Sequence, residues 1–467
     1  MILLSSGSGK MGVVFFLALV FISITVLVLL PLDFGSQQWN NPTKWADNPK
    51  SVPPVWMQPF AGSDAIQHMK FHTSEPVKRT SEEAIYNFSY DYHSSTPPTF
   101  ISFATSDIHF LKHPPVLIVE VHRPDGKKLR LLQTVVRGAR SGEPLPITRY
   151  GEVPLRILLS ENQSTLDLAS DFLREEFSVD HTTEQLRGNL EELVFGTPTI
   201  HDPSKYTPLN GQYRFEIRAL LRDHQDRIGQ VNLVVGGNHY GIIGTDAIGR
   251  DLALGLLFGF PVAMIIGLST ALFSTTIGTF LGILSGYMSG KTDTLIQRFA
   301  DIWSNIPLLP ILIFLIFILG QKLWLVVLIL ILFGWPGLTI TVRSMVLQIR
   351  TGQLVEATRS LGASGNRIMF RHILFQISPF VFAQMIFFIP TAILAEAGLS
   401  FLGLGDPSIP TWGQILESSF RTGAVFLGYW WWVLPPGLLI VMTAMTFVLL
   451  TLGLEPVINP RLRSAKK

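Results

Sequence analysis

The chain has 467 residues, of which 48% are hydrophobic and 15% are charged. This composition is too apolar for an ordinary soluble protein and too charged for a protein that lies wholly in a membrane. It therefore indicates a membrane part and a water-exposed part. The formal net charge of +2 argues against nucleic acid as a main partner. The absence of cysteine excludes disulfides and thiolate metal sites.

The first membrane span is expected at Met11–Leu32, an uncharged apolar stretch that is long enough to cross a bilayer. Lys10 is the only charged residue before it, which favours a cytoplasmic amino terminus. A cleaved signal peptide is the alternative. Its apolar core would be shorter and would end at small residues, whereas this stretch ends in Leu29-Leu30-Pro31. We therefore favour a membrane anchor.

Residues 34–245 have a different character, because charges and prolines replace the long apolar stretches and ten of the eleven histidines lie there. The sequence from Arg123 to Gly126 predicts a tight turn, since Pro124 presets φ and glycine takes the positive-φ position. Two short helices are also plausible, and Thr182–Phe195 places its apolar residues on one helical face. Strands are expected at Ile85–Tyr92, Thr99–Thr105, Pro115–Val121, Lys127–Gln133, Leu155–Leu159, Gln212–Leu221 and Ile228–Val235. We expect a β-rich, sandwich-like extracytoplasmic domain here, because about 200 residues can bury a core of their own.

Five further spans are expected after this domain. Leu252–Met288 is too long for one simple span and Pro261 interrupts it, so we expect an interfacial helix that leads into a span. The others are expected at Ile306–Leu319, Leu323–Thr341, Ile377–Leu394 and Tyr429–Leu452. A cytoplasmic carboxyl terminus is favoured by its basic residues, Arg461, Arg463, Lys466 and Lys467. Six crossings agree with two cytoplasmic ends and place residues 34–245 outside.

Two motifs resemble ligand sites without meeting their requirements. The segment Ser285–Thr292 has serine where a phosphate loop needs its first glycine, and it follows a span instead of a strand. Any ATPase must therefore be another chain. His68 and His72 could bind a metal if they were helical, but the neighbouring residues favour a loop and no third ligand is evident. Those neighbours are Gly62, Ser63 and Pro76. We expect no cofactor, no metal and no enzymatic activity in this chain.

A polar loop at about residues 343–376 interrupts the later spans. Five arginines, at positions 343, 350, 359, 367 and 371, stand there against the single acid Glu356, which favours the cytoplasmic side. A helical turn or two is expected at Glu356–Leu361, a sharp change of direction at Gly362 and a new helix at Ala363–Leu374. Such a loop could transmit a push from a soluble partner, although an ordinary basic loop beside a membrane is the simpler interpretation.

The sequence of this loop resembles the EAA loop of ABC-importer permeases, and its detail (EATRSLGAS, then RIMFRHIL) resembles the dipeptide/oligopeptide/nickel permease family. Glu356, Ala357 and Gly362 stand at the signature positions of that loop. The resemblance implies an ATPase-docking segment formed by Glu356, Ala357, Thr358, Leu361, Gly362, Ala363 and Ser364. One departure is Phe375, which stands where the family usually has proline, while Pro379 follows four residues later. This departure affects the expected start of the helix that leads into the fifth span, and it does not affect the docking segment.

A second segment, Gly244–Asp251, resembles the GTD-x-x-GRD segment that these permeases carry before their second span. The resemblance makes it a membrane-entry motif of Gly244, Thr245, Asp246, Gly249, Arg250 and Asp251. The two glycines permit tight turns, and the charged residues could pair with one another. We favour a structural role over substrate contact, with Asp251 acting at the amino end of the following helix.

A third segment, Glu396–Gly405 followed by Pro410–Gly413, resembles the family's sequence after the fifth span. Glu396 is an acid among apolar neighbours, and such a group usually faces a cavity or a partner. A structural hydrogen bond in the outer loop is an equal alternative. Glu396 is therefore a candidate pathway residue, and both interpretations stay open.

The resemblance implies an α-helical polytopic membrane protein with six transmembrane helices of the type I importer permease fold. The β-rich domain would lie between helices 1 and 2. The expected domains are residues 1–33 with the first helix, 34–245, and the permease core at 246–467. Such a subunit forms a path for short peptides, or for nickel complexes or oligosaccharides, in the inner or plasma membrane.

The same resemblance implies the partners. They are a second homologous permease, two cytoplasmic ABC ATPases, an extracytoplasmic solute-binding protein and the lipid bilayer. A secondary transporter or channel with an external sensing domain is the alternative function. It would usually place several charged groups within its spans, and here Glu396 alone lies near mid-span. A membrane enzyme would need converging catalytic groups, which the sequence does not display.

The region from about Gln58 to Val235 is much longer than the few dozen residues usual at this place in the family. It could form a lid or a docking platform for the solute-binding protein, or it could be a spacer. The sequence does not decide between these roles.

Overall fold

The computed structural model describes residues 6–199, 202 and 205–458, so the basic tail from Arg461 to Lys467 lies outside the described residues. The chain forms two compact units, one of Thr43–Asp251 and one of Met1–Pro42 together with Leu252–Lys467. The first is the β-rich unit and the second the membrane unit. The boundaries at residues 33/34 and 245/246 stay predictions.

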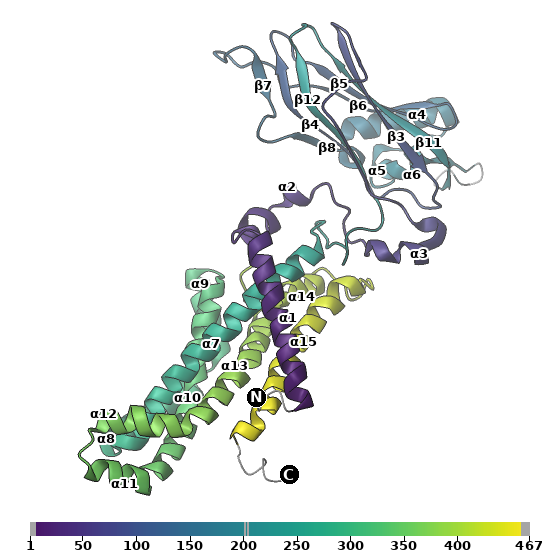
Figure 1. The fold of residues 1–467 in the computed structure, drawn as a ribbon. Coiled ribbons are helices and arrows are strands. Elements are labelled where there is room, and N and C mark those ends of the chain that lie inside the picture. The colour runs from purple at the N-terminus through teal and green to yellow at the C-terminus, as the bar shows by residue number, and fades with distance from the viewer. Residues whose placement is uncertain (1–5, 200–201, 203–204, 459–467) are drawn as a thin grey trace. The chain divides into compact units, whose positions relative to one another are not determined.

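Two antiparallel five-stranded sheets build the β-rich unit (Figure 1). One has the order β2-β3-β11-β5-β6, and the other has the order β1-β12-β4-β7 with β8 also paired to β4. A small ribbon of β9 and β10 stands apart from them. The strands are β1 (Met69–Thr73), β2 (Lys78–Arg79), β3 (Glu83–Tyr92), β4 (Ile101–Phe110), β5 (Val116–His122), β6 (Lys128–Val135), β7 (Ile147–Arg149), β8 (Leu155–Leu158), β9 (Gly196–Pro198), β10 (Tyr206–Pro208), β11 (Gly211–Leu220) and β12 (Arg227–Val235).

The core of this unit comes from alternating residues of the long strands. In β3 every second side chain is buried, and β11 repeats the pattern beside it, in a continuous ladder from Gly211↔Tyr92 to Leu220↔Glu83. An alternation of buried and outward side chains is the pattern of a strand with one face in the core. The aromatic rings meet inside, where Phe195 lies 4.9 Å from Tyr92 and 4.7 Å from Tyr213 between ring centroids.

All seven predicted strands are present, and the structure adds β1, β2, β7, β9 and β10. The predicted helix at Thr182–Phe195 is two helices, α5 (Thr183–Leu186) and α6 (Leu190–Phe195). Gly188 separates them with a φ of +80°, a conformation that favours glycine and ends a helix. The largest helix of the unit, α4 (Gln163–Phe177), was not predicted at its position. It packs against β6 through a buried face that includes Leu166, Ala169 and Leu173.

The membrane unit contains five described helices that are long and apolar enough to cross a bilayer, or six if one bent pair counts as a span. The sequence predicted six spans, and the described helices reach that number when the bent pair is counted as one span. The long helices are α1 (Gly7–Leu29), α7 (Leu252–Met288), α10 (Leu323–Arg350), α13 (Leu374–Phe401) and α15 (Trp430–Ile458). Between the last two lies α14 (Trp412–Arg421).

The predicted span at Ile306–Leu319 needs correction. Its helix, α9 (Leu308–Leu319), has 12 residues and reaches only about 18 Å, short of a hydrocarbon core of roughly 30 Å. It forms a pair with α8 (Gly290–Asn305), bent by 77°. Pro307 lies at the break, where its ring favours the end of one helix and the start of another. The pair α8–α9 therefore takes the place of a single straight span.

A second correction concerns Pro261. The structure has no separate entry helix, since α7 runs through Pro261 as one helix of 37 residues. Its length of about 55 Å exceeds the thickness of the bilayer core. The entry segment and the span are therefore parts of one continuous helix. Packing explains the continuity, because Pro261 and its neighbours Phe260 and Val262 are all buried.

Small residues bring α7 and α10 into close contact. A Cβ at Gly278 would lie 2.8 Å from the carbonyl oxygen of Trp335, and a Cβ at Gly282 would lie 2.8 Å from that of Thr339. Gly286 approaches the carbonyl oxygen of Arg343 in the same way, at 2.9 Å. These glycines recur every four residues and so form one stripe, the arrangement by which membrane helices approach closely.

Candidate functional site

The polar loop between α10 and α13 contains a short helix, α11 (Gln353–Ser360), at one end of the membrane unit (Figure 1). Gly362 ends it with a φ of +81°, and the Ala363 N–H donates to the Thr358 carbonyl at 3.2 Å. A left-handed glycine with such a bond is a common helix terminus. The chain then continues through α12 (Gly365–Arg367), the π-helical turn η6 (Ile368–Ile373) and α13. The predicted helix, elbow and second helix are confirmed.

A single buried side chain, Val355, anchors α11 to the membrane unit. Val355 packs in a cluster of apolar residues from α7, α10 and the segment leading into α13. Its buried members are Ile283, Leu338, Val342, Val346, Val355, Ile368, Met369, Ile373 and Ile377. A movement of α11 would therefore act directly on the ends of three long helices.

The predicted docking residues lie mostly on the free surface of this loop. Glu356, Ala357, Gly362 and Ser364 are exposed, whereas Thr358 and Ala363 are partly buried. Leu361 is 88% exposed, an unusual position for a leucine unless another surface covers it. The loop thus offers a narrow, mixed polar and apolar surface beside a rigid anchor.

An ion pair that sequence reasoning missed lies close to this loop. The Arg343 Nε and Nη2 atoms each donate to the Asp293 carboxylate at 2.6 Å, which is the bidentate arrangement of strong guanidinium–carboxylate pairs. Ser285 Oγ also donates to Asp293, at 2.5 Å. Arg350 donates to the Tyr287 carbonyl and to Ser289. These bonds join the end of α7 to α8 and α10.

The same contacts explain why Ser285–Thr292 is not a phosphate loop. Ser285 belongs to the end of the long helix α7, Ser289 lies just before α8, and both bond to the charged residues of the ion-pair network. A phosphate loop instead follows a strand.

The Gly244–Asp251 segment folds into a closed turn within the β-rich unit. The Asp246 carboxylate accepts the backbone N–H groups of Ile248 and Arg250 at 3.0 and 2.9 Å, and it pairs with the Arg250 side chain. The Thr245 hydroxyl donates to the Pro49 carbonyl at 2.7 Å. Gly249 has a φ of +87° and packs against backbone. These bonds favour a structural role, while the part of the motif in membrane entry stays a prediction.

Glu396 lies on α13 and is 4% exposed. Ser400 Oγ donates to its carboxylate at 2.6 Å, one helical turn further along. Gly413 of α14 packs close by, since a Cβ there would lie 2.7 Å from Ala397. This bond lies within α13 and not in the outer loop, so both interpretations of Glu396 stay predictions.

Comparison with known proteins identifies the family. The chain is 32% identical over 233 residues to the dipeptide transport system permease protein DppC of Bacillus subtilis, an alignment that covers 50% of this chain and 72% of that protein. It is 34% identical over 223 residues to the oligopeptide transport system permease protein OppC of the same organism, covering 47% and 72%. Residues 278–464 match the family model of the binding-protein-dependent transport system inner membrane component. The chain belongs to this family.

The protein is thus a permease of an ABC importer and carries no catalytic site of its own. It is a multi-pass inner-membrane component of a system that in general includes ATPase and binding-protein partners. A solved inward-facing MetNI methionine ABC transporter matches with a TM-score of 0.37 and 18% identity, over 45% of this chain and 97% of that one. The family match begins after the β-rich unit.

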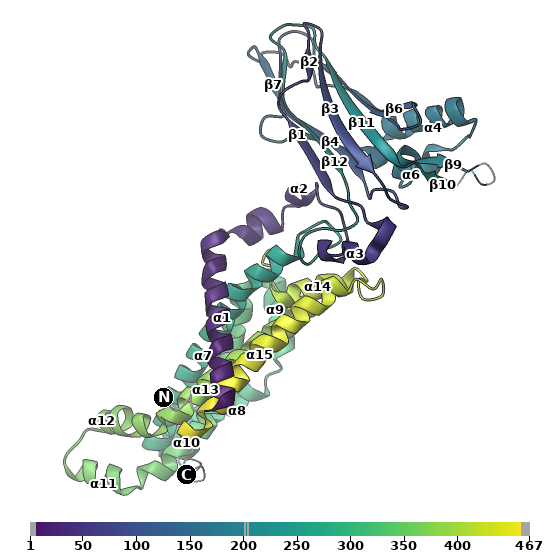
Figure 2. The same cartoon turned by 45° about the vertical axis from the view of Figure 1, so that its right-hand side comes forward.

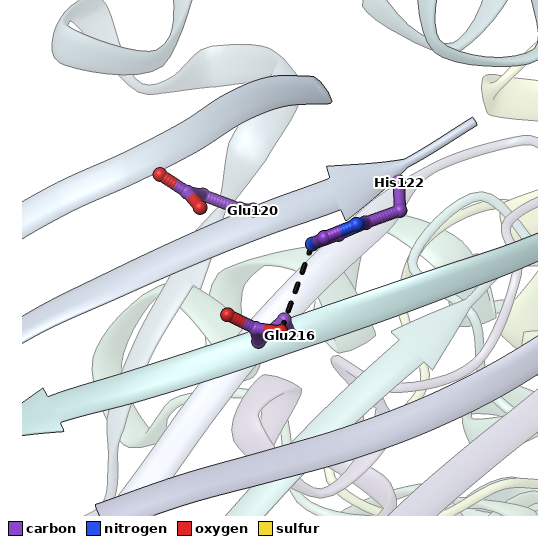
Figure 3. A group of neighbouring side chains, drawn as sticks. All are labelled: Glu120, His122 and Glu216. Carbon is purple, nitrogen blue, oxygen red and sulfur yellow. Dashed lines mark ion pairs between the residues drawn. The ribbon is translucent and has the colours of Figure 1, made fainter. Parts of the chain in front are cut away.

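One cluster in the β-rich unit of the permease has the composition of a metal site. Glu120 and His122 of β5 and Glu216 of β11 place one possible ligand atom each within 4.8 Å of the others (Figure 3). The carboxylates of this cluster, however, are already paired with arginines. Glu120 accepts from Arg130 and from Arg218, both at 2.9 Å. Cation binding would have to displace these charge-assisted bonds.

The ring of His122 also opposes metal binding. Arg214 Nη2 lies 3.1 Å from His122 Nδ1, and because a guanidinium can only donate, Nδ1 must be the acceptor. The proton of the neutral ring then sits on Nε2, which faces Glu216 at 3.6 Å and has no lone pair for a metal. Burial and Arg214 lower the pKa of His122, which keeps the ring neutral. We interpret the cluster as a charge network on the sheet surface.

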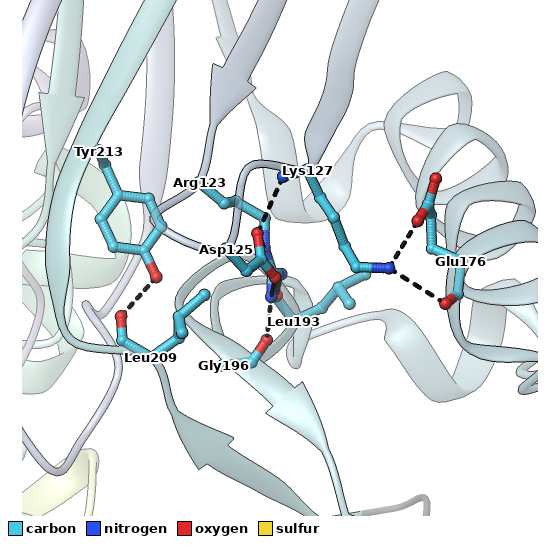
Figure 4. Close-up of polar contacts among 8 residues, drawn as sticks. All are labelled: Arg123, Asp125, Lys127, Glu176, Leu193, Gly196, Leu209 and Tyr213. Atoms are coloured by element: carbon cyan, nitrogen blue, oxygen red, sulfur yellow. Dashed lines mark hydrogen bonds and ion pairs between the residues drawn. The ribbon is translucent and has the colours of Figure 1, made fainter.

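Arg123 of the permease ties the helices to the sheet (Figure 4). Its side chain is fully buried, and it donates to the carbonyl oxygens of Leu193 at 2.5 Å and Gly196 at 2.9 Å. Asp125 neutralises its charge at 3.0 Å, within the predicted tight turn. The guanidinium also lies 5.7 Å from the ring centre of Phe172, on α4. Sequence reasoning recognised the turn but not this function of its first residue.

Glu191 on α6 is a deeply buried acid of the β-rich unit, and its pKa is strongly raised. Its side chain accepts the Ile101 N–H at 3.1 Å and is 4% exposed. Burial raises its pKa from 4.5 to about 7, because an apolar surrounding disfavours the charged form. Between these two values the folded protein holds a proton that the unfolded chain gives up. The free energy of unfolding contributed by Glu191 therefore falls as pH rises from about 4.5 to about 7.

We expect Glu191→Gln to remove this pH dependence. The difference in the free energy of unfolding between variant and wild type should increase by about 3 kcal/mol, in favour of the variant, as the pH rises from 4.5 to 8. This is the free energy that corresponds to the raised pKa of Glu191. The measurement is unfolding of the full-length permease in detergent at several pH values. Only the difference between variant and wild type is compared, which removes the contribution of other titrating groups. Glu184→Gln, at an exposed acid in the same region, is the control for the loss of one carboxylate.

Proposed function

We propose that this permease forms the translocation path for short peptides that an external binding protein delivers. The relatives DppC and OppC carry the names of dipeptide and oligopeptide transport systems, and they align along most of their own length. A peptide is therefore the cargo best supported by the relatives. Glu396, a buried acid on a membrane helix, is the candidate side chain of the path.

The proposed assembly contains a second homologous permease and two cytoplasmic ATPases. The chain ends and the α11 loop lie in the cytoplasm and residues 34–245 outside, because five arginines between positions 343 and 371 favour the cytoplasmic side. The Gly244–Asp251 turn precedes α7 and sets the entry of the chain into the membrane. ATP binding in the partner subunits moves α11, and the spans respond by alternating access.

The observation that carries this proposal is the way α11 is held. Only Val355 of this helix is buried, and it is buried in a cluster built from the ends of the long helices. The rest of the segment, with Glu356 and Leu361, is free to contact a partner. A load applied to α11 can pass to the spans through this contact, through the short link of residues 351–352 to α10 and through the Gly362 elbow.

We expect charge reversal at Glu356 together with Gly362→Leu to abolish recovery of the ATPase with the permease. Glu356→Lys changes the exposed surface, and leucine is strained at a φ of +81° and turns the following segment. The measurement is co-purification from membranes that express the whole importer. Lys322→Glu is the matched control, an exposed charge reversal just before the other end of α10.

Equal recovery of the ATPase with the double variant and with the wild type would contradict the docking role of α11. Loss of the ATPase with the Lys322→Glu control as well would show a general effect of charge and would contradict it too.

A further inference from the structure

One strand edge of the β-rich unit lacks a partner over most of its length. Strand β3 pairs with β11 along its whole length on one side, but on the other side β2 covers only Ala84 and Ile85 (Figure 2). The stretch from Asn87 to Tyr92 therefore forms a free edge of the sheet. Figure 2 shows β2 at the start of β3 only.

The backbone groups on this edge can be assigned from the ladder. The Glu83 and Ile85 carbonyls accept from Thr80 and Val77, on the side of β2, at 2.8 and 2.7 Å. Backbone groups alternate in direction along a strand, so those of Asn87, Ser89 and Asp91 point to the same open side. Their N–H and C=O groups have no partner among the described residues. Asn87 Oδ1 is also buried there without a hydrogen bond.

The other long edges of the two sheets are protected, which makes this one distinctive. The edge strand β6 has a register shift opposite Val119 and Glu120 and packs against α4, while β7, β8 and β1 are short. Proteins usually guard an edge by short strands, bulges, covering helices or loops, charged side chains or proline. In the stretch Asn87–Tyr92 the exposed charge of Asp91, near the end of the strand, is the one such residue. A weakly guarded edge is suited to pairing with another extended chain.

A groove lies against this edge. It has a volume of about 290 Å³, and Ser89 and Asp91 line one side while Ile66, Gln67 and Met69 line the other. The opposite wall is held in place, because the Ile66 N–H donates to Asn238 Oδ1 at 2.9 Å. The size is at the lower limit of ligand sites, which hold roughly 300–1,000 Å³. The groove therefore suits a short extended chain and is too small for a folded domain.

We propose that the Asn87–Tyr92 edge binds a short peptide as an added β-strand, a site at which the permease captures its cargo outside the membrane path. The backbone of the peptide would satisfy the free groups of Asn87, Ser89 and Asp91. Since the ladder bonds involve only the backbone of the ligand, the site accepts many sequences. This inference rests on the proposed peptide cargo.

Ser89→Pro tests the proposal with little cost to the fold. Proline removes the outward N–H of residue 89 and its ring blocks an added strand, but the bonds from β3 to β11 stay, because residue 89 does not donate to β11. Ser89→Ala is the matched control, since it changes the side chain and keeps the backbone. The probe is a fluorescein-labelled hexapeptide of alternating threonine and valine. Its binding to the full importer without binding protein or ATP is measured by fluorescence anisotropy.

We expect Ser89→Pro to weaken peptide binding about tenfold and Ser89→Ala to change it less than about twofold. The same hexapeptide N-methylated at every amide should fail to compete. Hydrogen exchange of the wild type gives a reading that needs no variant. The amides of Asn87, Ser89 and Asp91 should become protected when the peptide is added.

Unchanged affinity in Ser89→Pro, or amides at the edge that stay unprotected, would overturn the proposal. The proposal would also be overturned if a strand of the binding protein protected the edge amides from exchange but the hexapeptide did not. ATP-driven uptake of the hexapeptide separates the two proposals. If the wild type takes up the hexapeptide but the edge shows no binding, only the proposed edge site is contradicted. If the wild type takes up no hexapeptide, the proposed peptide cargo is contradicted.

Discussion

Replacing Arg123 with methionine should lower the free energy of unfolding of the β-rich unit by about 3–5 kcal/mol. Methionine has a similar length but donates no hydrogen bond, so the carbonyl oxygens of Leu193 and Gly196 would lose their donor inside the core. Asp125 would lose its counter-charge as well. Each unsatisfied buried group costs about 1–3 kcal/mol. The two helices α4 and α6 should therefore separate from the sheet first.

The measurement is thermal unfolding of the full-length permease, combined with proteolysis to follow the β-rich unit. Arg174→Met is the control, because its side chain is 60% exposed and its ion pairs lie at the surface. It should change stability by no more than about 0.5 kcal/mol. Arg123→Lys should fall between the two, since an ammonium keeps the charge but not the fork of donors. A loss below about 1 kcal/mol in Arg123→Met would contradict the role of Arg123 as a tie.

The second large effect is expected at the contact between α7 and α10. Gly282→Ala would place a Cβ 2.7 Å from the Cβ of Val342 and 2.8 Å from the carbonyl oxygen of Thr339, so the helices must move apart. Overpacking of this kind costs about 1–3 kcal/mol. Because Val342 also belongs to the cluster around Val355, ATP-coupled transport should fall with stability.

Heating the purified permease and measuring the folded fraction by size-exclusion chromatography gives the result. Gly337→Ala is the matched control. It lies on α10, and a Cβ there would meet nothing within 4 Å. This control should be neutral or slightly stabilising, because alanine favours a helix more than glycine does. Equal behaviour of the two variants would contradict the close packing of α7 on α10.

Local patterns predicted the parts of this fold that depend on local chemistry. Alternation in β3 and β11 is visible in the residues themselves, and so are the helix before Gly362 and the turn at Pro124. The sequence also contains a signal for α4, namely a capping residue and a helical spacing of apolar residues, although this helix was not predicted. Asn162 caps it by accepting the Thr165 N–H at 3.1 Å, and its buried face follows a helical spacing.

Other features depend on partners that are distant in the sequence. Arg123 reads as an ordinary turn residue, because the carbonyls that it binds lie 70 and 73 residues further along the chain. The Asp293–Arg343 pair spans 50 residues and depends on how α8 meets α10. Pro261 was expected to interrupt a helix, but close packing around α7 overrides the local preference.

The free edge of β3 belongs to the same class. Sequence alternation predicts the strand, but only the sheet order reveals that Asn87–Tyr92 has no neighbour on one side. In the same way, the sequence predicted the short helix of the polar loop and the change of direction at Gly362. It did not predict that Val355 of this helix is buried against three long helices.

The central claim is that α11 is the cytoplasmic contact through which a separate ATPase drives this permease. The chain has no cysteine, so Thr358→Cys gives a single reactive thiol on α11. The most direct measurement is labelling of this thiol in sealed membranes, followed by crosslinking in the assembled importer. We expect a membrane-impermeant maleimide to react only from the cytoplasmic side, and a short crosslinker to join residue 358 to the ATPase. Labelling from outside, or a transport-active importer in which residue 358 never crosslinks to the ATPase, would contradict the claim.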